Sequence, residues 1–146
     1  TCIGTCRKTR AIGEKMAGLS PTQRTLRALR QRGLVCAIVE RFDHYAGPHG
    51  LRRDLFGILD ILALCPERGV IGVQSCGQAF AQHKHKILEQ RQQETVEWLS
   101  TPGTSFELWA WRKIKLNRGG KAMRWKPRVA RICLDNSGDI IFIEDK

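Results

Sequence analysis

Two apolar runs joined by a short turn constrain the fold of this chain most strongly. GILDILAL spans residues 57–64 and GVIGVQSC spans residues 69–76, with CPER between them. Short apolar runs rich in β-branched residues and bounded by Gly and Pro are typical of buried strands. Each run nevertheless carries one polar side chain, Asp60 in the first and Gln74 in the second. A buried carboxylate is costly unless it is paired or binds a cation, so the two positions mark a candidate site.

The other elements are predicted from capping, periodicity and turn residues. SPTQRTLRALRQRG begins with a capping box of Ser20 and Gln23 and ends at Gly33, which predicts a helix. Apolar periodicity predicts a second helix over 78–100, and β-rich runs predict strands over 34–45, 54–64, 69–76, 105–116, 124–135 and 139–145. The order predicts an α/β (α+β) domain, α-β-β-β-α-β, whose mixed sheet is flanked by helices.

Length and charge limit the class of protein. The chain has 146 residues, which favours one domain over residues 20–146 after a basic N-terminal arm over residues 1–19. Its net charge of +11 and pI near 9.9 favour a polyanionic partner, with nucleic acid first. The sequence has neither a run of roughly 20 apolar residues nor a signal-peptide core, so we expect no membrane contact and a cytoplasmic location, in a host cell if the protein is viral.

The six cysteines are scattered, which favours reduced thiols over a disulfide scaffold. Cys2 and Cys6 have the spacing of half a zinc site. A structural zinc needs four ligands, and no second close pair of Cys or His follows at a familiar spacing to complete the set.

Strand geometry brings the two polar residues of the apolar runs together. Side chains alternate between the faces of a strand, and the turn between the runs is short, so Asp60 and Gln74 are predicted to point at one spot. A carboxylate and an amide oxygen are ligands suited to Mg²⁺ or Mn²⁺. Glu40 and Asp54 are candidates for further metal ligands, although Asp54 could instead pair with Arg52 or Arg53.

This pattern resembles the PD-(D/E)XK nuclease superfamily, which includes Holliday junction resolvases and restriction endonucleases. In that superfamily one strand carries an aspartate, and the next carries an acidic residue, a spacer and a lysine. GILDILAL resembles the aspartate strand, with Asp60 as the metal ligand. GVIGVQSC resembles the next strand, with Gln74 at the acidic position and Cys76 at the lysine position. The resemblance covers roughly residues 20–113 and implies a restriction-endonuclease-like core.

The superfamily tolerates a lysine that reaches the site from the neighbouring helix. Lys84 lies four residues after Phe80 and four before Leu88, which predicts that it faces the sheet while Lys86 points elsewhere. Lys84 is therefore the candidate for the missing lysine. His83 is a further candidate for metal, proton or phosphate contact, although an isolated histidine is more often structural.

The resemblance implies a Mg²⁺- or Mn²⁺-dependent endonuclease that hydrolyses phosphodiester bonds in DNA, including branched or phage and mobile-element DNA. Asp60, Gln74 and Lys84 would be its catalytic residues, and relatives in the superfamily suggest a homodimer. Two alternatives stay open: a nuclease fold that has lost catalysis and binds nucleic acid, and a ribosome- or RNA-associated basic protein unrelated to nucleases.

Basic residues gather in the first helix and in the segment RKIKLNRGGKAMRWKPR, which reads as a β-hairpin with a glycine pair near its middle. We expect this surface to contact the DNA backbone with little sequence specificity, and a tryptophan to stack on bases or pack beneath the hairpin. The predicted contact residues are Arg24, Arg27, Arg30, Arg53, Lys113, Lys115, Arg118, Lys121, Arg124, Trp125 and Lys126.

Overall fold

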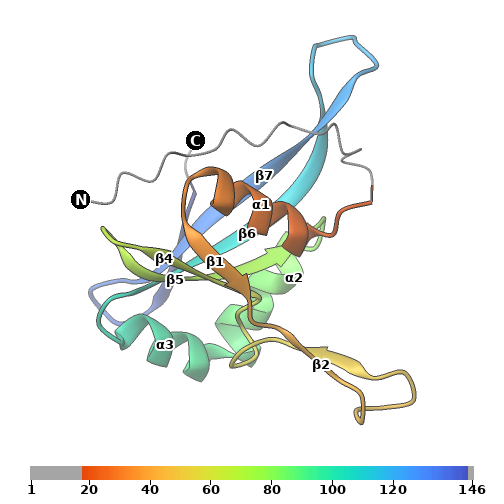
Figure 1. Ribbon diagram of the computed structural model, residues 1–146. Helices are drawn as coiled ribbons and strands as arrows, with labels where there is room; N and C mark the ends of the chain where they lie inside the picture. Colours follow the sequence, from red (N-terminus) through yellow and green to blue (C-terminus); the bar gives the residue numbers. More distant parts are fainter. Residues whose placement is uncertain (1–17, 145–146) are drawn as a thin grey trace, which may run out of the picture.

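The computed structural model describes residues 18–144 and shows a central sheet with helices on both faces (Figure 1). The predictions about Cys2, Cys6 and most of the N-terminal arm lie outside the described residues. In chain order the elements are α1 (Pro21–Gln31), β1 (Val35–Ile38), β2 (Arg41–Asp43), β3 (Leu51–Arg53), β4 (Ile61–Cys65), β5 (Gly69–Cys76), α2 (Phe80–His85), the π-helical turn η1 (Lys86–Gln90), α3 (Gln92–Ser100), β6 (Thr104–Lys115), β7 (Met123–Leu134) and β8 (Ile140–Glu144).

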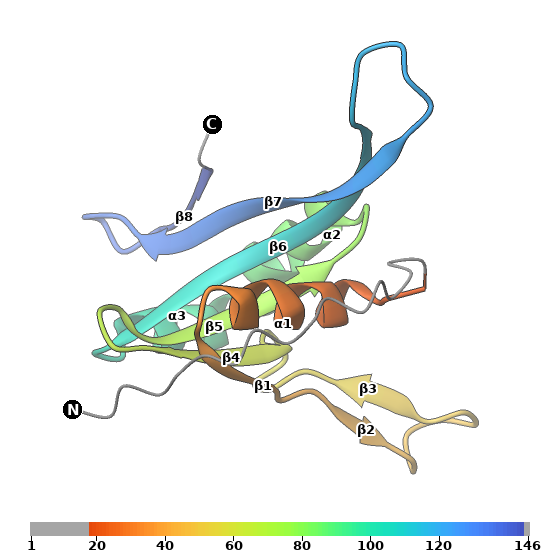
Figure 2. The ribbon, with the colours of Figure 1, turned by 45° about the horizontal axis from the view of Figure 1, so that its top comes forward.

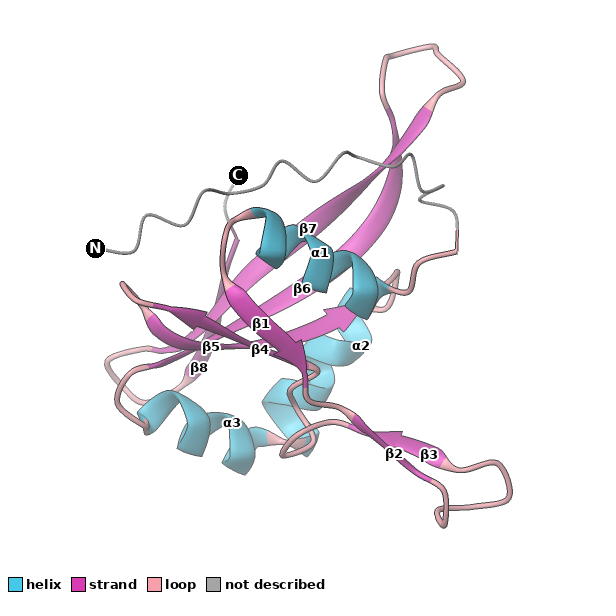
Figure 3. Ribbon diagram, viewed as in Figure 1, coloured by secondary structure: helices cyan, strands magenta, loops and turns pink. Residues whose placement is uncertain are grey.

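The main sheet is mixed, as the sequence predicts. Its strand order is β1-β4-β5-β6-β7-β8, and β2 and β3 form a separate two-stranded sheet. The pair β5–β6 is parallel because the helical segment from α2 to α3 crosses between them, whereas the other neighbours are antiparallel. The α+β class with a mixed sheet is therefore confirmed (Figure 3).

Two apolar cores lie on opposite faces of the sheet. Alternation along β5 sends Ile71 and Val73 to the face covered by α1, and Cys76 to the face covered by α2 and α3. Gly72 allows a close approach on the second face, because a Cβ built there would lie 2.5 Å from Leu59 and 2.9 Å from Trp98. Helices on both faces therefore bury the whole second half of β5.

Helix α1 is held on its face by polar contacts as well as by packing. Ser20 and Gln23 form the predicted capping box. The buried Thr25 hydroxyl accepts hydrogen bonds from the Ser75 hydroxyl at 2.9 Å and from the Trp111 indole N–H at 2.8 Å. The Ser75 hydroxyl thus lies on the face of β5 opposite Gln74 and away from the candidate site.

The two strands predicted over 34–45 and 54–64 are wrong in their bounds. The first splits, because the backbone N–H groups of Val39 and Glu40 both turn towards the Asp60 carbonyl and the chain leaves the sheet. The second begins only at β4, after a turn in which Phe56 adopts a left-handed φ of 56°. The helix predicted over 78–100 is present, but it contains the π-helical turn η1 and breaks at Arg91.

Two hairpins extend beyond the body of the molecule. The β2–β3 arm, residues 41–53, and the distal half of the β6–β7 hairpin both project from the end of the sheet at which β5 finishes (Figures 1 and 2). The β6–β7 hairpin is the basic segment predicted from the sequence, whereas the β2–β3 arm is a feature that the sequence did not reveal. None of the helices in the described part of the chain is long and apolar enough to cross a membrane.

Candidate metal centre

Asp60 lies at the junction of three backbone segments. It directly precedes β4, its N–H donates to the Val73 carbonyl at 2.8 Å, and its own carbonyl accepts from the Val39 N–H at 2.8 Å. The side chain is 2% exposed. Its Oδ2 accepts hydrogen bonds from the Gln74 Nε2 at 2.7 Å and from the Ser75 N–H at 2.8 Å. The prediction that Asp60 and Gln74 point at one spot is therefore confirmed.

Three carboxylates converge at this junction. Ligand oxygens of Glu40, Asp54 and Asp60 all lie within 4.8 Å of one another, and the first two side chains are half-buried. Oxygens bound to one Mg²⁺ at about 2.1 Å can lie up to ~4.2 Å apart, so small side-chain rotations would suffice for shared ligation. These are the residues that the sequence named as metal ligands, apart from Gln74. The alternative pairing of Asp54 with an arginine is wrong, since Arg52 lies near Glu40 and Arg53 pairs with Asp43.

The lysine of the site is Lys86, and the choice of Lys84 is corrected. Lys86 Nζ donates to Asp54 Oδ2 at 3.1 Å and to Gln74 Oε1 at 3.0 Å. Lys84 instead places its Nζ 5.1 Å from the ring centre of Phe142 on β8. Lys84 does face the sheet, as predicted, but it lies over β8 and not over the strands that carry the acidic cluster. The helical spacing predicts which face of the helix carries a side chain, but not which strand of the sheet that side chain lies over. In addition, the α-helix changes to a π-helical turn at Lys86, which alters the direction of the side chains that follow.

Burial and neighbouring acids set the protonation of the cluster. Burial raises the pKa of Asp60 to about 8, helped by a hydrogen bond with Asp54 and by the negative charges of Asp54 and Glu40. Burial also opposes ionisation of Asp54, but the hydrogen bond with Asp60 and the Lys86 ammonium outweigh it and lower the Asp54 pKa. Without a cation, Asp60 therefore holds a proton at neutral pH while Asp54 is ionised.

Gln74 belongs to the site, but the group that faces Asp60 is its amide nitrogen and not its amide oxygen. Its oxygen accepts from Lys86, so ligation of a cation through that oxygen requires the amide to turn. Cys76 is buried on the same side of β5, and burial together with the charge of Asp60 raises the pKa of its thiol to about 11. The thiol is therefore neutral and supplies neither the charge of a lysine nor a thiolate.

An open groove leads to the cluster. Its volume is about 650 Å³, and its lining includes Asp54, Phe56 and Lys86 together with four arginines, Arg41, Arg52, Arg53 and Arg91. A second hollow of about 520 Å³ is also lined by Lys86 and includes His83. Burial and the Lys86 charge lower the pKa of His83, so its imidazole is neutral at pH 7. Asp54, one of the three clustered acids, thus meets four arginines in the first groove, an arrangement suited to a cation bound together with a phosphate.

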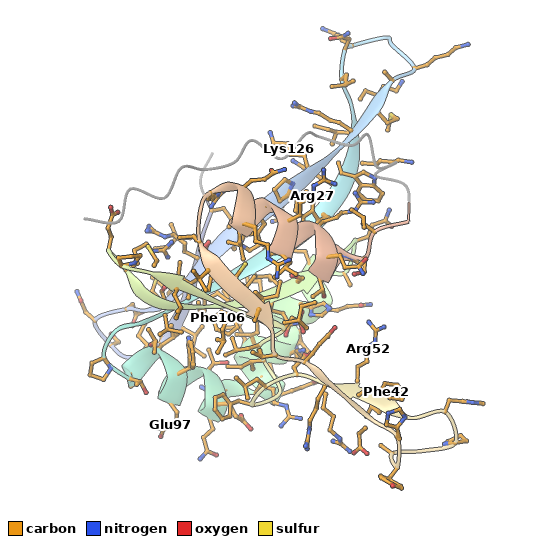
Figure 4. The ribbon with its side chains drawn as sticks, in the orientation of Figure 1. Arg27, Phe42, Arg52, Glu97, Phe106 and Lys126 are labelled. Atoms are coloured by element: carbon orange, nitrogen blue, oxygen red, sulfur yellow. The ribbon has the colours of Figure 1, made fainter. Side chains whose placement is uncertain are left out.

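Most of the predicted DNA-contact residues lie on exposed parts of α1 and of the two hairpins. Figure 4 labels Arg27 on α1 and Lys126 on β7. The β6–β7 register pairs Lys126 with Arg112 and Arg124 with Ile114, which sets both on the sheet face that carries Gln74. The exposed members of the predicted set are Arg30, Arg53, Lys113, Lys115, Arg118, Lys121, Arg124 and Lys126, while Arg27 is half-buried.

Two members of the predicted contact set are packed inside. Arg24 is only 3% exposed, and its guanidinium stacks 4.0 Å from the ring centre of Trp125. Trp125 is half-buried, with Lys113 Nζ 5.6 Å from its ring. Arg24 is therefore corrected from a surface contact to a packing residue, because an aromatic side chain from a distant strand covers it. The tryptophan packs beneath the hairpin, which was the second of the two predicted arrangements.

The scan against protein-family models found no match, and the searches of curated proteins and of solved structures found none either.

Proposed function

We propose that this protein is a Mg²⁺- or Mn²⁺-dependent endonuclease that hydrolyses phosphodiester bonds in DNA. The observation that carries the proposal is that the carboxylates of Glu40, Asp54 and Asp60 converge where Lys86 bonds Asp54, beside a groove lined by Asp54, Lys86 and four arginines. Catalytic sites typically combine several carboxylates in a cleft with a nearby lysine, and some of these groups have shifted pKa values, as Asp54 and Asp60 do here.

The element order supports a restriction-endonuclease-like core. A helix, an antiparallel three-strand meander, a helical crossover and a parallel strand are present as α1, β1-β4-β5, α2 to α3, and β6, with the β2–β3 arm inserted between β1 and β4. Asp60 precedes the middle strand of the meander, and Gln74 lies near the end of the next. The resemblance to the PD-(D/E)XK superfamily thus rests on the topology as well as on the short motif.

The chain's own residues have distinct roles in the proposed reaction. A bound Mg²⁺ or Mn²⁺ would lower the pKa of a water molecule and polarise the scissile phosphate. Asp54 and Asp60, with Glu40, would hold the ion, and Asp60 would give up its proton on binding. The Lys86 ammonium, already on the groove side of Asp54, would turn to a phosphate oxygen and offset the charge that develops there.

Charge and shape favour DNA as the partner. The β6–β7 hairpin and the β2–β3 arm lie on either side of the sheet end that carries the site, and both carry exposed basic residues (Figure 2). Lysines and arginines that neutralise phosphates release counterions, so binding would weaken steeply with salt. A homodimer and a cytoplasmic location belong to the same proposal.

A nucleic-acid-binding protein without catalysis is the second candidate. Its support is the hydrogen bonding at Gln74, which donates to Asp60 and accepts from Lys86, so that the polar groups satisfy one another without a cation. A glutamate at this position would repel Asp60 and draw in a cation. Gln74 therefore weakens the demand for a metal.

The test is cleavage of supercoiled plasmid and of branched oligonucleotides with Mg²⁺ or Mn²⁺. The nuclease proposal predicts nicking by the wild-type protein, no nicking in EDTA, and loss of nicking in Asp60→Asn. Binding of DNA without cleavage under all these conditions would support the second candidate, and absence of both activities would overturn both.

A further inference from the structure

The β2–β3 arm, residues 41–53, is rooted in the acidic cluster. β2 begins directly after Glu40, and β3 ends directly before Asp54. Two of the three carboxylates are therefore the residues through which the chain enters and leaves the arm. The arm therefore extends directly from the candidate metal centre.

The arm has a defined conformation of its own. Arg53 Nε donates to Asp43 Oδ2 at 3.0 Å across the two strands. The other Asp43 oxygen accepts from the Tyr45 N–H at 3.0 Å and shapes the turn. The Phe42 ring meets His44 edge to face, with 4.6 Å between ring centres. These contacts hold the backbone at the tip and leave the Tyr45 side chain free of packing.

Aromatic side chains are exposed at the tip of the arm, along its shaft and just beyond its root. Tyr45 at the tip is 98% exposed, and Phe42 on the shaft is 47% exposed. Just beyond the root, Phe56 is 58% exposed and lines the groove beside Asp54. Phe56 also has a φ of 56°, a left-handed conformation that L side chains rarely adopt and that often marks a functional position. Figure 4 labels Phe42 and Arg52, which lie along the shaft between these ends.

We propose that the arm is a base-stacking finger, in which Tyr45 stacks on an unpaired base of the nucleic acid whose phosphate enters the acidic site. This proposal rests on the proposed function for the identity of the partner. An exposed aromatic ring binds any base through its π face, and the arginines of the shaft follow the phosphates. The arm has three arginines and one aspartate, so its charge complements a polyanion.

The length of the arm sets where the unpaired base must lie. The tip is about four residues from the root, or roughly 13 Å at the rise of a β-strand. Stacked nucleotides rise about 3.4 Å each, so the base under Tyr45 lies about four nucleotides from the scissile phosphate. The preferred substrate is therefore DNA with an unpaired segment next to the cut, as in a gap, a flap or a junction, and not a continuous duplex.

The experiment measures binding in EDTA, so that no substrate is cut. Fluorescence anisotropy compares a continuous duplex with the same duplex carrying a four-nucleotide gap, for the wild-type protein, Tyr45→Ala and Tyr45→Phe. We expect Tyr45→Ala to lose about tenfold in affinity for the gapped DNA, the size expected for one lost stack, and less than twofold for the duplex. Tyr45→Phe keeps the ring and is expected to bind as the wild-type protein does.

Other outcomes overturn the proposal. An equal loss of affinity for the gapped DNA and the duplex would mean that Tyr45 contacts DNA without stacking on an unpaired base. No loss of affinity for either DNA would mean that Tyr45 does not contact DNA. Loss of a dimer in Tyr45→Ala, seen by light scattering, would make the tip a contact between protein copies. If Tyr45 proves neutral while Asp60-dependent cleavage persists, only the stacking finger fails. If gap selectivity depends on Tyr45 but nothing is cleaved, only the nuclease proposal fails.

Discussion

Replacing Asp60 by asparagine is expected to stabilise the metal-free protein at alkaline pH. The buried Asp60 carboxyl has its pKa raised to about 8, so the folded protein binds a proton that the unfolded chain releases near pH 4. The stability that comes from the neutral carboxyl is complete below pH 4 and is lost as the pH rises from about 4 to about 8. Asparagine has nearly the same shape and stays neutral throughout.

The magnitude follows from proton linkage. Each pH unit between the two pKa values costs about 1.36 kcal/mol, so the wild-type protein loses about 4 kcal/mol relative to Asp60→Asn between pH 5 and pH 8. Asp54 does not offset this difference, because its pKa is lowered and it is ionised in both the folded and the unfolded state over that range. The titration of His83 is common to both proteins and cancels in the comparison.

The assay is urea unfolding of both proteins in EDTA at several pH values between 5 and 8. We expect the free energies of unfolding to diverge steadily with pH, with Asp60→Asn the more stable at pH 8. If the free energies of unfolding of the two proteins run parallel with pH, or diverge by less than about 1 kcal/mol between pH 5 and pH 8, burial does not hold a proton on Asp60.

Three further predictions concern the site and its packing. In plasmid-nicking assays, Lys86→Met is expected to lower the cleavage rate about 100-fold, whereas the matched control Lys84→Met should change the rate by less than about twofold. Equal effects of the two substitutions would contradict the assignment of Lys86 as the lysine of the site. Gln74→Glu adds a ligand charge, so calorimetry at pH 8 should find Mn²⁺ bound about tenfold more tightly, and unchanged affinity would exclude this position from the metal site. Gly72→Ala forces a Cβ against Leu59 and Trp98 and should cost about 1 to 3 kcal/mol in urea unfolding; an unchanged free energy of unfolding would contradict the close packing at this position.

Local rules predicted the parts of the fold that depend on neighbouring residues. The capping box of α1 needs only Ser20 and Gln23, and β5 has the predicted bounds, 69–76. The meeting of Asp60 and Gln74 followed from strand alternation and a short turn. These inferences needed no knowledge of distant contacts.

The parts that were missed depend on contacts between distant segments. Burial of Arg24 requires the ring of Trp125, which lies far along the chain. Lys86 reaches Asp54 because of where the helix crosses the sheet and because of the π-helical turn that begins there. The strands of the β2–β3 arm have three residues each, which is too short for the alternation of apolar and polar residues in a strand to be recognised. The local signal for the arm is the cluster of turn residues AGPHG over 46–50, which indicates a turn but not the two short strands on either side of it.

The position of a bound Mn²⁺ ion tests the central claim most directly. A crystal grown with Mn²⁺ is expected to give an anomalous peak roughly 2.1 to 2.4 Å from carboxylate oxygens of Asp54 and Asp60, with Lys86 Nζ displaced from Asp54. The same crystal form of Asp60→Asn is expected to give no peak there. A wild-type cluster without a peak at saturating Mn²⁺, and with Lys86 still bonded to Asp54, would contradict the account.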